Sequence, residues 1–188
     1  MGLSVDDVRK AFNESYDAVL VQFEIPDETV LEVCRLAKEK NIPVVVDAGP
    51  AKNFPLEKIK GIEILSPNET EVFAMCGVDI KSEEDIEKAA KILKDRSECN
   101  FVVIKMGKEG AYVYSDDISK MIPVKRKVKA VDTTAAGDCF TAAMTVSFLK
   151  DKNIKKAIAY GHLAAGISVT RLGAIPSLPT ANEIEKLL

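Results

Sequence analysis

Short runs of almost continuous apolar residues alternate along this chain with stretches of helical periodicity. Residues 16–23, 43–47 and 101–105 are such runs, and their unbroken apolar character is typical of strands covered on both faces. Strands that alternate with helices form βαβ units, in which parallel strands carry helices on the faces of the sheet. The sequence therefore predicts an α/β fold with a mostly parallel sheet, in a single domain of residues 1–188.

Capping residues mark where the helices between these strands begin. Ser4 and Ser82 each precede an amphipathic pattern, and Asp27 is expected to cap another helix. Thr180 and Glu183 form a capping-box pattern before a last helix. The expected helices cover about residues 4–15, 27–38, 66–77, 82–93, 140–148, 154–170 and 180 onward, and the expected strands about residues 16–23, 43–47, 63–65, 101–105, 111–114 and 121–128.

The charges are nearly balanced, with 26 Lys and Arg against 29 Asp and Glu, and they form no long run of one sign. This balance argues against a nucleic-acid-binding protein and against a polybasic membrane-binding surface. The longest apolar-leaning run, residues 139–149, is well short of the roughly 20 residues that span a bilayer. The first residues lack the basic and then apolar regions of a signal peptide. We therefore expect a cytoplasmic protein that binds neither nucleic acid nor membranes.

A zinc or disulfide framework is not expected. The four cysteines (Cys34, Cys76, Cys99 and Cys139) are widely scattered and include no C-x-x-C pair. His162 is the only histidine of the chain. This pattern favours free thiols.

A turn of small residues with two aspartates, residues 131–140, precedes an apolar helical pattern. Because Thr133 to Gly137 have little side-chain bulk, their backbone N–H groups can converge on a bound oxyanion, and the helix would direct its positive end at the same point. Asp138 lies at the rim of this turn, where it either caps the helix or takes part in chemistry. Asp is a common helix cap, and small residues are ordinary before a helix.

Polar residues follow several of the expected strands. Glu24, Asp47, Asn68, Lys105 and Asp132 all fall at or just beyond a strand end. Parallel α/β sheets bind ligands at the carboxyl ends of their strands, so we expect these residues to share one crevice.

Six segments resemble sequence motifs of a known protein family. They follow the same order along the chain and together span essentially its whole length. Residues 132–140 resemble the C-terminal signature of the ribokinase family of carbohydrate kinases (phosphofructokinase-B type), and within it the ribokinase branch, whose turn often reads A-A-G-D. The other five segments are residues 22–26, 47–51, 67–71, 107–110 and 169–177. The resemblance implies a three-layer α/β/α fold of the ribokinase-like type, with a mostly parallel sheet.

The resemblance implies that Asp138 is the catalytic base, which takes the proton from a primary hydroxyl of the sugar as that oxygen attacks the γ-phosphate of ATP. Ala135, Ala136 and Gly137 would supply the N–H groups that stabilise charge on the transferring phosphoryl group. The chemistry fits, because a loose phosphoryl-transfer transition state needs only a weak and well-placed base. Glu24 would contact the sugar together with Asp138.

Asn68 and Glu71 match the N-x-x-E motif with which this family orders Mg²⁺ and the nucleotide phosphates. Such a site is water-mediated, because Mg²⁺ keeps much of its hydration shell. A purely structural interpretation stays open, since Glu71 is also an acid in the first turn of a helix.

Lys105, Gly107 and Gly110 match the turn that follows the phosphates and ribose of the nucleotide. Here the chain departs from the family, because many ribokinases have Thr in place of Lys105, and they usually have Asn in place of Asp47. His162 lies where the family places a residue beside the adenine, although packing or exposure would equally explain a single helical histidine.

The resemblance also implies a monovalent cation, K⁺, which would order the anion-binding turn without touching the substrate. Its donors would be mostly backbone carbonyls. The matching residues are Asp132, Thr134, Ser168, Arg171, Gly173 and Ser177.

The front of the chain departs most from the family. Residues 1–21 contain neither the Gly-Gly-Lys-Gly-x-Asn sugar-binding motif nor the lid strands. The chain thus looks like the C-terminal, nucleotide-binding portion of such a kinase, lacking the N-terminal strands and lid. Because that segment supplies central strands, we expect an exposed sheet edge that leads to self-association.

Three functions are consistent with these observations. The first is an ATP-dependent sugar kinase, in the leading case one that converts D-ribose to D-ribose 5-phosphate, with fructose, a nucleoside or a keto-deoxy sugar acid as other substrates. The second is a nucleotide-binding fragment that is inactive without its N-terminal segment. The third, a non-catalytic scaffold, is disfavoured because Asn68, Glu71, Gly137 and Asp138 are all present.

Overall fold

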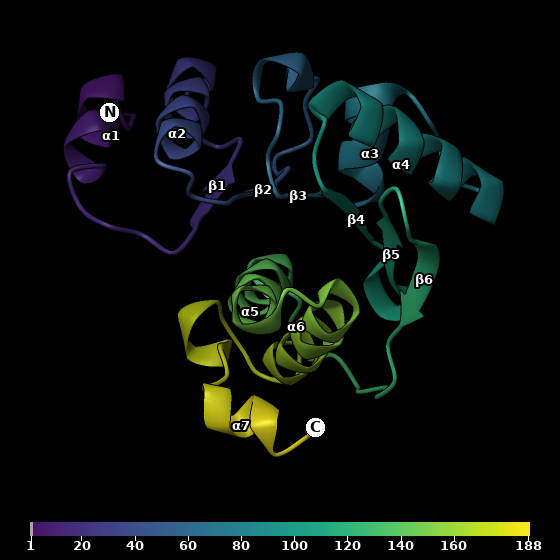
Figure 1. Ribbon diagram of the computed structural model, residues 1–188. Coiled ribbons are helices and arrows are strands. Elements are labelled where there is room, and N and C mark those ends of the chain that lie inside the picture. Colours follow the sequence, from purple (N-terminus) through teal and green to yellow (C-terminus); the bar gives the residue numbers. More distant parts are fainter. Residues whose placement is uncertain (1) are drawn as a thin grey trace. The chain divides into compact units, whose positions relative to one another are not determined.

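The computed structural model describes residues 2–188, which form two compact units (Figure 1). The first comprises the residues up to Met106 together with Tyr112–Lys120, and the second comprises Gly107–Ala111 together with Met121–Leu188. The single domain expected over residues 1–188 stays a prediction.

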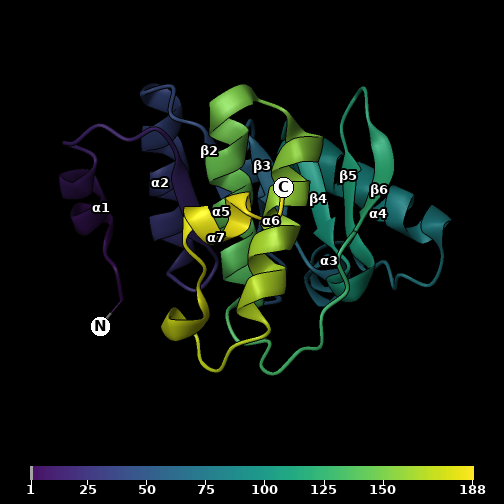
Figure 2. The ribbon, with the colours of Figure 1, turned by 90° about the horizontal axis from the view of Figure 1, so that it is seen from below.

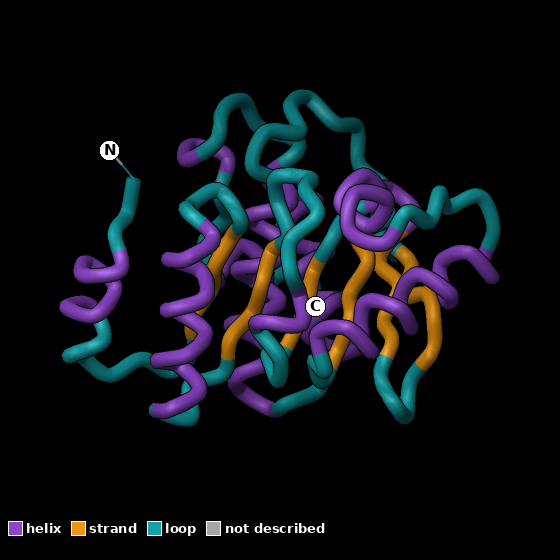
Figure 3. The backbone as a smooth tube through the Cα atoms, turned by 90° about the horizontal axis from the view of Figure 1, so that it is seen from above, coloured by secondary structure: helices purple, strands orange, loops and turns teal. Residues whose placement is uncertain are grey.

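The central feature is a six-stranded sheet, whose strands are drawn in orange in Figure 3. The strand order is β1-β2-β3-β4-β5-β6, as labelled in Figure 1. Strands β1 to β4 are parallel, with each strand beside its predecessor in the chain. This arrangement confirms the mostly parallel sheet predicted from the alternation of strands and helices. The strands are β1 (Val19–Gln22), β2 (Val44–Asp47), β3 (Ile64–Ser66), β4 (Phe101–Lys105), β5 (Gly110–Tyr114) and β6 (Ser119–Pro123).

The helices of the first unit lie on one face of strands β1 to β4 (Figure 1). All residues of β2 and β3 are buried, as are residues 102–104 of β4, which explains why these runs are continuously apolar. The helices are α1 (Val5–Ala11), α2 (Asp27–Glu39), α3 (Glu69–Cys76) and α4 (Glu83–Ser97), with a short 3₁₀ helix η1 (Leu56–Lys58).

Side-chain caps start two of these helices where the sequence predicts them. Ser4 and Ser82 each accept a hydrogen bond from the backbone N–H three residues later, which confirms both caps. Gly77 ends α3 in the left-handed conformation, with φ of 72°. The prediction for Asp27 is wrong, because Pro26 is the cap residue and Asp27 is the first helical residue.

The second unit is built on two helices that run side by side, α5 (Ala136–Asp151) and α6 (Ile154–Ser168) (Figure 2). The short helix α7 (Ala181–Glu185) contacts α6, and two 3₁₀ helices are η2 (Gly107–Glu109) and η3 (Ile175–Ser177). The strand expected at residues 121–128 is wrong in its bounds, since β6 runs from Ser119 to Pro123. Residues 125–130 are all exposed and leave the sheet.

A glycine permits the close approach of α5 and α6. A Cβ atom added to Gly161 in α6 would lie 2.9 Å from both the ring and the carbonyl oxygen of Phe140 in α5. Phe140 is itself buried and follows the small-residue turn directly. The start of α5 is therefore positioned by backbone-to-ring contact with α6.

None of the helices within residues 2–188 is both long and apolar enough to cross a membrane. All four cysteines carry free thiols, and Cys34, Cys99 and Cys139 are buried. Burial raises the pKa of the Cys34 thiol to about 12, so this thiol is protonated and unreactive at neutral pH.

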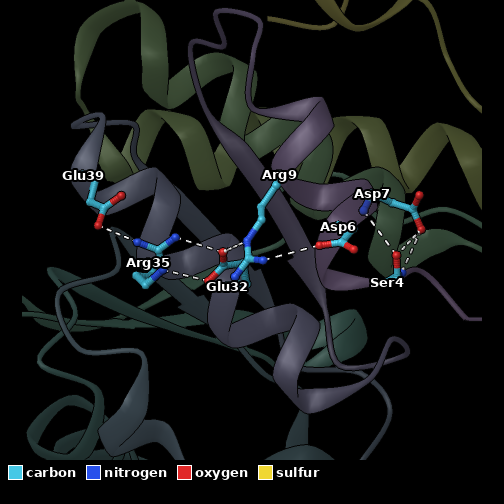
Figure 4. Close-up of polar contacts among 7 residues, drawn as sticks. All are labelled: Ser4, Asp6, Asp7, Arg9, Glu32, Arg35 and Glu39. Carbon is cyan, nitrogen blue, oxygen red and sulfur yellow. Dashed lines mark hydrogen bonds and ion pairs between the residues drawn. The ribbon is translucent and has the colours of Figure 1, made fainter.

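Charged side chains connect α1 to α2 (Figure 4). The Glu32 carboxylate, only 10% exposed, accepts hydrogen bonds of 2.7 Å from Nε of Arg35 and from Nε of Arg9. Asp6 and Glu39 extend the network at its two ends. The hydrogen bonds from Arg35 and Arg9 lower the pKa of Glu32 to about 2.

We expect this network to make stability depend on pH in acid. The pKa of Glu32 is about 2 in the folded chain against 4.5 for an ordinary glutamate. The ionised Glu32 therefore contributes its full share to the free energy of unfolding above pH 4.5. This contribution is lost as the pH falls toward 2. Urea unfolding between pH 7 and pH 2.5 should show a smaller loss of stability for Glu32→Gln than for the wild type. Glu39→Gln is the matched control, and equal pH profiles for Glu32→Gln and the wild type would contradict the prediction.

The helix contact at Gly161 yields a second expectation. Gly161→Ala should lower the free energy of unfolding by about 1–3 kcal/mol, because the added methyl group meets Phe140 with no space to occupy. Gly166 lies in the same helix and has no atom within 4 Å of an added Cβ. Gly166→Ala should therefore be neutral or stabilising, by up to about 1 kcal/mol. Denaturant unfolding of both variants checks this, and equal stabilities would refute the tight contact.

Candidate active site

The small-residue turn forms the start of α5 in the second unit. Ala135 is the cap residue and has φ of 59°, a conformation that residues other than glycine rarely adopt. The Ala136 N–H donates to the Thr133 carbonyl, and the first helical hydrogen bond runs from Cys139 N–H to the Ala135 carbonyl. Gly137 and Asp138 thus lie in the exposed first turn of a 16-residue helix. This is the geometry that binds anions.

The position of Asp138 bears on the two interpretations left open by the sequence. The cap residue of α5 is Ala135, and its side chain makes no capping hydrogen bond. Asp138 is the third residue of the helix, and it is exposed. A cap role therefore does not explain this aspartate.

The other aspartate of the turn, Asp132, has a different environment. One carboxylate oxygen accepts hydrogen bonds from Thr134 N–H (2.9 Å) and Thr134 Oγ1 (2.6 Å), and the other accepts one from Gly173 N–H (2.9 Å). These bonds, from Thr134 first and then Gly173, lower the pKa of Asp132 to about 2. Asp132 therefore joins the turn to the loop that follows α6.

The residues expected to hold a monovalent cation lie together in this second unit. Ser168 and Ser177 are buried and 2.9 Å apart through their hydroxyl oxygens. The Arg171 guanidinium pairs with Glu183, so Arg171 can offer a cation only its carbonyl oxygen. The remaining groups are carboxylate, hydroxyl and carbonyl oxygens, and a hard cation such as K⁺ fits this donor set.

A cavity of about 320 Å³ lies in the second unit, and His162 is part of its lining. The His162 ring centroid is 5.3 Å from that of Phe140. Burial lowers the pKa of His162 to about 4, so its imidazole is neutral at physiological pH. The other lining residues are mostly apolar: Pro123, Val124, Lys125, Arg126, Val128, Ala159, Leu163, Gly166, Ile167, Thr170, Leu187 and Leu188.

Sequence reasoning found only one residue of this cavity. The missed residues come from three segments of the chain: residues 123–126 with Val128, the segment from Ala159 to Thr170, and the last two leucines. A signal was present in the four cations of residues 125–129, which stand directly before the small-residue turn.

Five polar residues of the first unit lie at the carboxyl ends of β2, β3 and β4. We call them the strand-end cluster: Asp47, Ser66, Asn68, Glu71 and Lys105. The Asn68 side-chain oxygen accepts from Glu71 N–H (2.9 Å), and the Glu71 carboxylate accepts from Asn68 N–H (2.7 Å) and from Asn68 Nδ2 (2.8 Å). Glu71 is thus an acid in the first turn of α3, where it forms the capping box with Asn68, and its role toward Mg²⁺ stays a prediction.

The structure pairs the two residues that depart from the family pattern. The Lys105 ammonium forms an ion pair with the Asp47 carboxylate, and the Lys105 N–H donates to the Pro67 carbonyl. Burial raises the pKa of Glu71, and the Lys105 ammonium acts against this rise. With Lys105 in place and both Glu71 oxygens accepting from Asn68, the cluster fits a hydrated Mg²⁺.

The remaining expected site residues belong to other segments of the chain. Glu24 is exposed in the turn that follows β1, and Asp132 belongs to the second unit. Gly107 and Gly110 have φ of 52° and 127°. A Cβ atom on Gly110 would lie 2.2 Å from the Ile122 carbonyl oxygen, so only glycine fits there.

Comparison with known proteins identifies the family. The model described as "pfkB family carbohydrate kinase" matches residues 4–181. The chain belongs to this family of carbohydrate kinases. Within the family it is similar to the ribokinase of Haemophilus influenzae, with 36% identity over 172 residues, which are 92% of this chain and 56% of the relative.

Solved structures support the same conclusion about the fold. A structure of Arabidopsis thaliana ribokinase complexed with ribose and ATP superposes with a TM-score of 0.85 and 33% identity, over 98% of this chain and 59% of that one. Ribokinase from Thermotoga maritima gives a TM-score of 0.83 and 36% identity, over 98% and 60% of the two chains. The fold is therefore ribokinase-like, as predicted. The chain spans little more than half the length of these relatives.

The bonds of Asp132 make a testable prediction. In Asp132→Asn the Gly173 and Thr134 N–H groups lose a charged acceptor, so their hydrogen exchange should be roughly tenfold faster. Amide exchange measured by NMR checks this. Asp151→Asn is the control, because Asp151 accepts from the local residues Asn153 and Lys156 at the α5–α6 turn. Unchanged exchange at Gly173 in Asp132→Asn would contradict the proposed connection.

Proposed function

We propose that this chain is the nucleotide-binding and catalytic portion of an ATP-dependent kinase that phosphorylates a sugar primary hydroxyl. The observation that carries the proposal is the exposed first turn of α5, in which Gly137 and Asp138 follow the strained cap residue Ala135. Membership of the carbohydrate kinase family supports it. D-ribose is the proposed substrate, with D-ribose 5-phosphate as product, because the matched relatives include ribokinases.

In the proposed reaction Asp138 accepts the proton of the sugar hydroxyl while that oxygen attacks the γ-phosphorus of ATP and ADP leaves. The Gly137 N–H precedes the first helical hydrogen bond, and it stabilises the negative charge on the transferring phosphoryl group. The N–H of Ala136 already donates to Thr133, so it contributes less than the sequence predicts. The positive end of the α5 dipole acts in the same direction.

The cavity beside His162 is proposed to hold the adenine. Its lining is mostly apolar, its volume of about 320 Å³ suits a base, and a neutral imidazole carries no charge that would oppose an uncharged ring. Lys125 and Arg126 line the same cavity and are exposed, so they would attract the nucleotide phosphates.

Two cations belong to the proposal. Mg²⁺, bound to the nucleotide phosphates, neutralises the charge that moves during transfer, with Asn68 and Glu71 ordering its hydration shell. K⁺ is proposed to be held by the oxygens of the Asp132 and Ser177 loops, where it would order the small-residue turn. Glu24 is proposed to contact the sugar. The reaction is proposed to take place in the cytoplasm, where ATP is available.

The predicted self-association also remains part of the proposal. Strand β1 ends the sheet order, and Leu20 within it is 46% exposed. An edge strand with an exposed apolar residue can pair with another chain. Fructose, a nucleoside and a keto-deoxy sugar acid are the alternative substrates.

The proposed function is tested by ADP release with MgATP and K⁺ across ribose, fructose, ribonucleosides and keto-deoxygluconate. Release with ribose supports the proposal, and release with another sugar corrects the substrate. Binding of ATP without release for any sugar would instead support the nucleotide-binding fragment. Absence of ATP binding would refute both functions.

Asp138→Asn tests the mechanism. The variant should bind MgATP within a few-fold of the wild type but lose transfer, because the amide keeps the shape and cannot accept the proton. Titration calorimetry measures the binding and the ADP-release assay measures transfer. Asp151→Asn is the control at the far end of the same helix. Transfer by Asp138→Asn at the wild-type rate would refute Asp138 as the base.

A further inference from the structure

The two departures from the family pattern, Asp47 and Lys105, contact each other. They stand 58 residues apart in sequence, at the carboxyl ends of β2 and β4, and their side chains are only 9% and 15% exposed. The ammonium of Lys105 is thus held in place inside the strand-end cluster.

The surroundings of this ammonium are rich in oxygen. Glu71 is 6% exposed, and its Oε1 lies 3.4 Å from the position of a Cβ atom on Gly49, two residues after Asp47. Ser66 is fully buried, and within residues 2–188 its hydroxyl oxygen has no hydrogen-bond partner. Ser66 is the register partner of Asp47 in parallel strands, so the two side chains leave the sheet on the same face.

Two buried carboxylates and a buried hydroxyl are the kind of oxygen set that binds Mg²⁺ or Mn²⁺. Buried carboxylates also require compensation when they ionise, because an unpaired charge is costly to bury. In this chain the compensating positive charge is part of a side chain and not a bound ion. The Lys105 ammonium supplies one positive charge at the cluster and occupies a position beside Asp47.

We propose that the Lys105 ammonium is a tethered cation that replaces a protein-bound divalent metal ion in the strand-end cluster. The protein without nucleotide then has no divalent site there, and Lys105 rather than a metal ion holds the ends of β2 and β4 together. Removal of the ammonium exposes the cluster of Asp47, Ser66 and Glu71 as a divalent site. One consequence rests on the proposed kinase function. If the chain is a kinase, the divalent ion of the reaction arrives bound to the nucleotide.

Binding of Mn²⁺ in the absence of nucleotide tests this, with free Mn²⁺ followed by electron paramagnetic resonance. Lys105→Met should bind one Mn²⁺ per chain at least about tenfold more tightly than the wild type, because one positive charge has left a buried cluster. The double variant Lys105→Met with Asp47→Asn should lose this site again. Lys105→Arg, which keeps the charge, should behave as the wild type.

Lys52→Met is the matched control. Lys52 also pairs with an aspartate, Asp27, at 2.6 Å, but Asp27 is 52% exposed. Loss of Lys52 should therefore create no Mn²⁺ site. Denaturant unfolding of each variant establishes that it is folded before Mn²⁺ is added.

Two results would overturn the proposal. One is a folded Lys105→Met that binds Mn²⁺ no better than the wild type. The other is a stoichiometric Mn²⁺ site in the wild type that Glu71→Gln abolishes, and this measurement decides even if Lys105→Met does not fold. Neither uses nucleotide or sugar, so a negative ADP-release assay would count against the proposed function and leave the tethered cation untouched.

Discussion

The parallel register of β1 to β4 is the constraint on which the first unit depends. It sets Gln22 level with Asp47, Asp47 level with Ser66, and Asn68 level with Lys105. Because all four strands run in one direction, their polar terminal residues gather at one edge of the sheet, where the helices begin. The strand interiors are buried and apolar, so a slip in register would bury these polar ends among apolar neighbours. Core packing and the placement of polar groups thus support the same register.

Local signals were sufficient to predict most of this fold. Alternating periodicities identified the strands and helices, and Ser4, Ser82 and Gly77 lie at helix ends, where short-range hydrogen bonds and φ preferences decide the structure. The errors arose where such signals compete. Asp27 can act as a cap or as a first-turn acid, and the chain uses it as the latter after Pro26. The segment after Pro123 resembles a strand by its valines but carries four cations, and it leaves the sheet with residues 125–130 exposed.

The candidate site was predictable only in part, for a related reason. The small-residue turn is contiguous in sequence, so its residue types alone indicate an anion-binding helix start. The ion pair of Asp47 and Lys105 joins positions 58 residues apart and exists only through the strand register. The cavity beside His162 similarly combines residues 123–126 and residues of α6 with Leu187 and Leu188. Contacts of this kind follow from tertiary packing, which no local pattern contains.

The two aspartates of the small-residue turn illustrate how environment divides one residue type between two tasks. Asp132 accepts three hydrogen bonds and has a pKa of about 2, so it is anionic at every physiological pH and is committed to holding two loops together. Such a carboxylate is a poor base, because protonation would weaken the hydrogen bonds that it accepts. Asp138, six residues later, is exposed at the start of a long helix whose cap is another residue. Of the two, Asp138 is the exposed one, which is the position that the proposed proton acceptor requires.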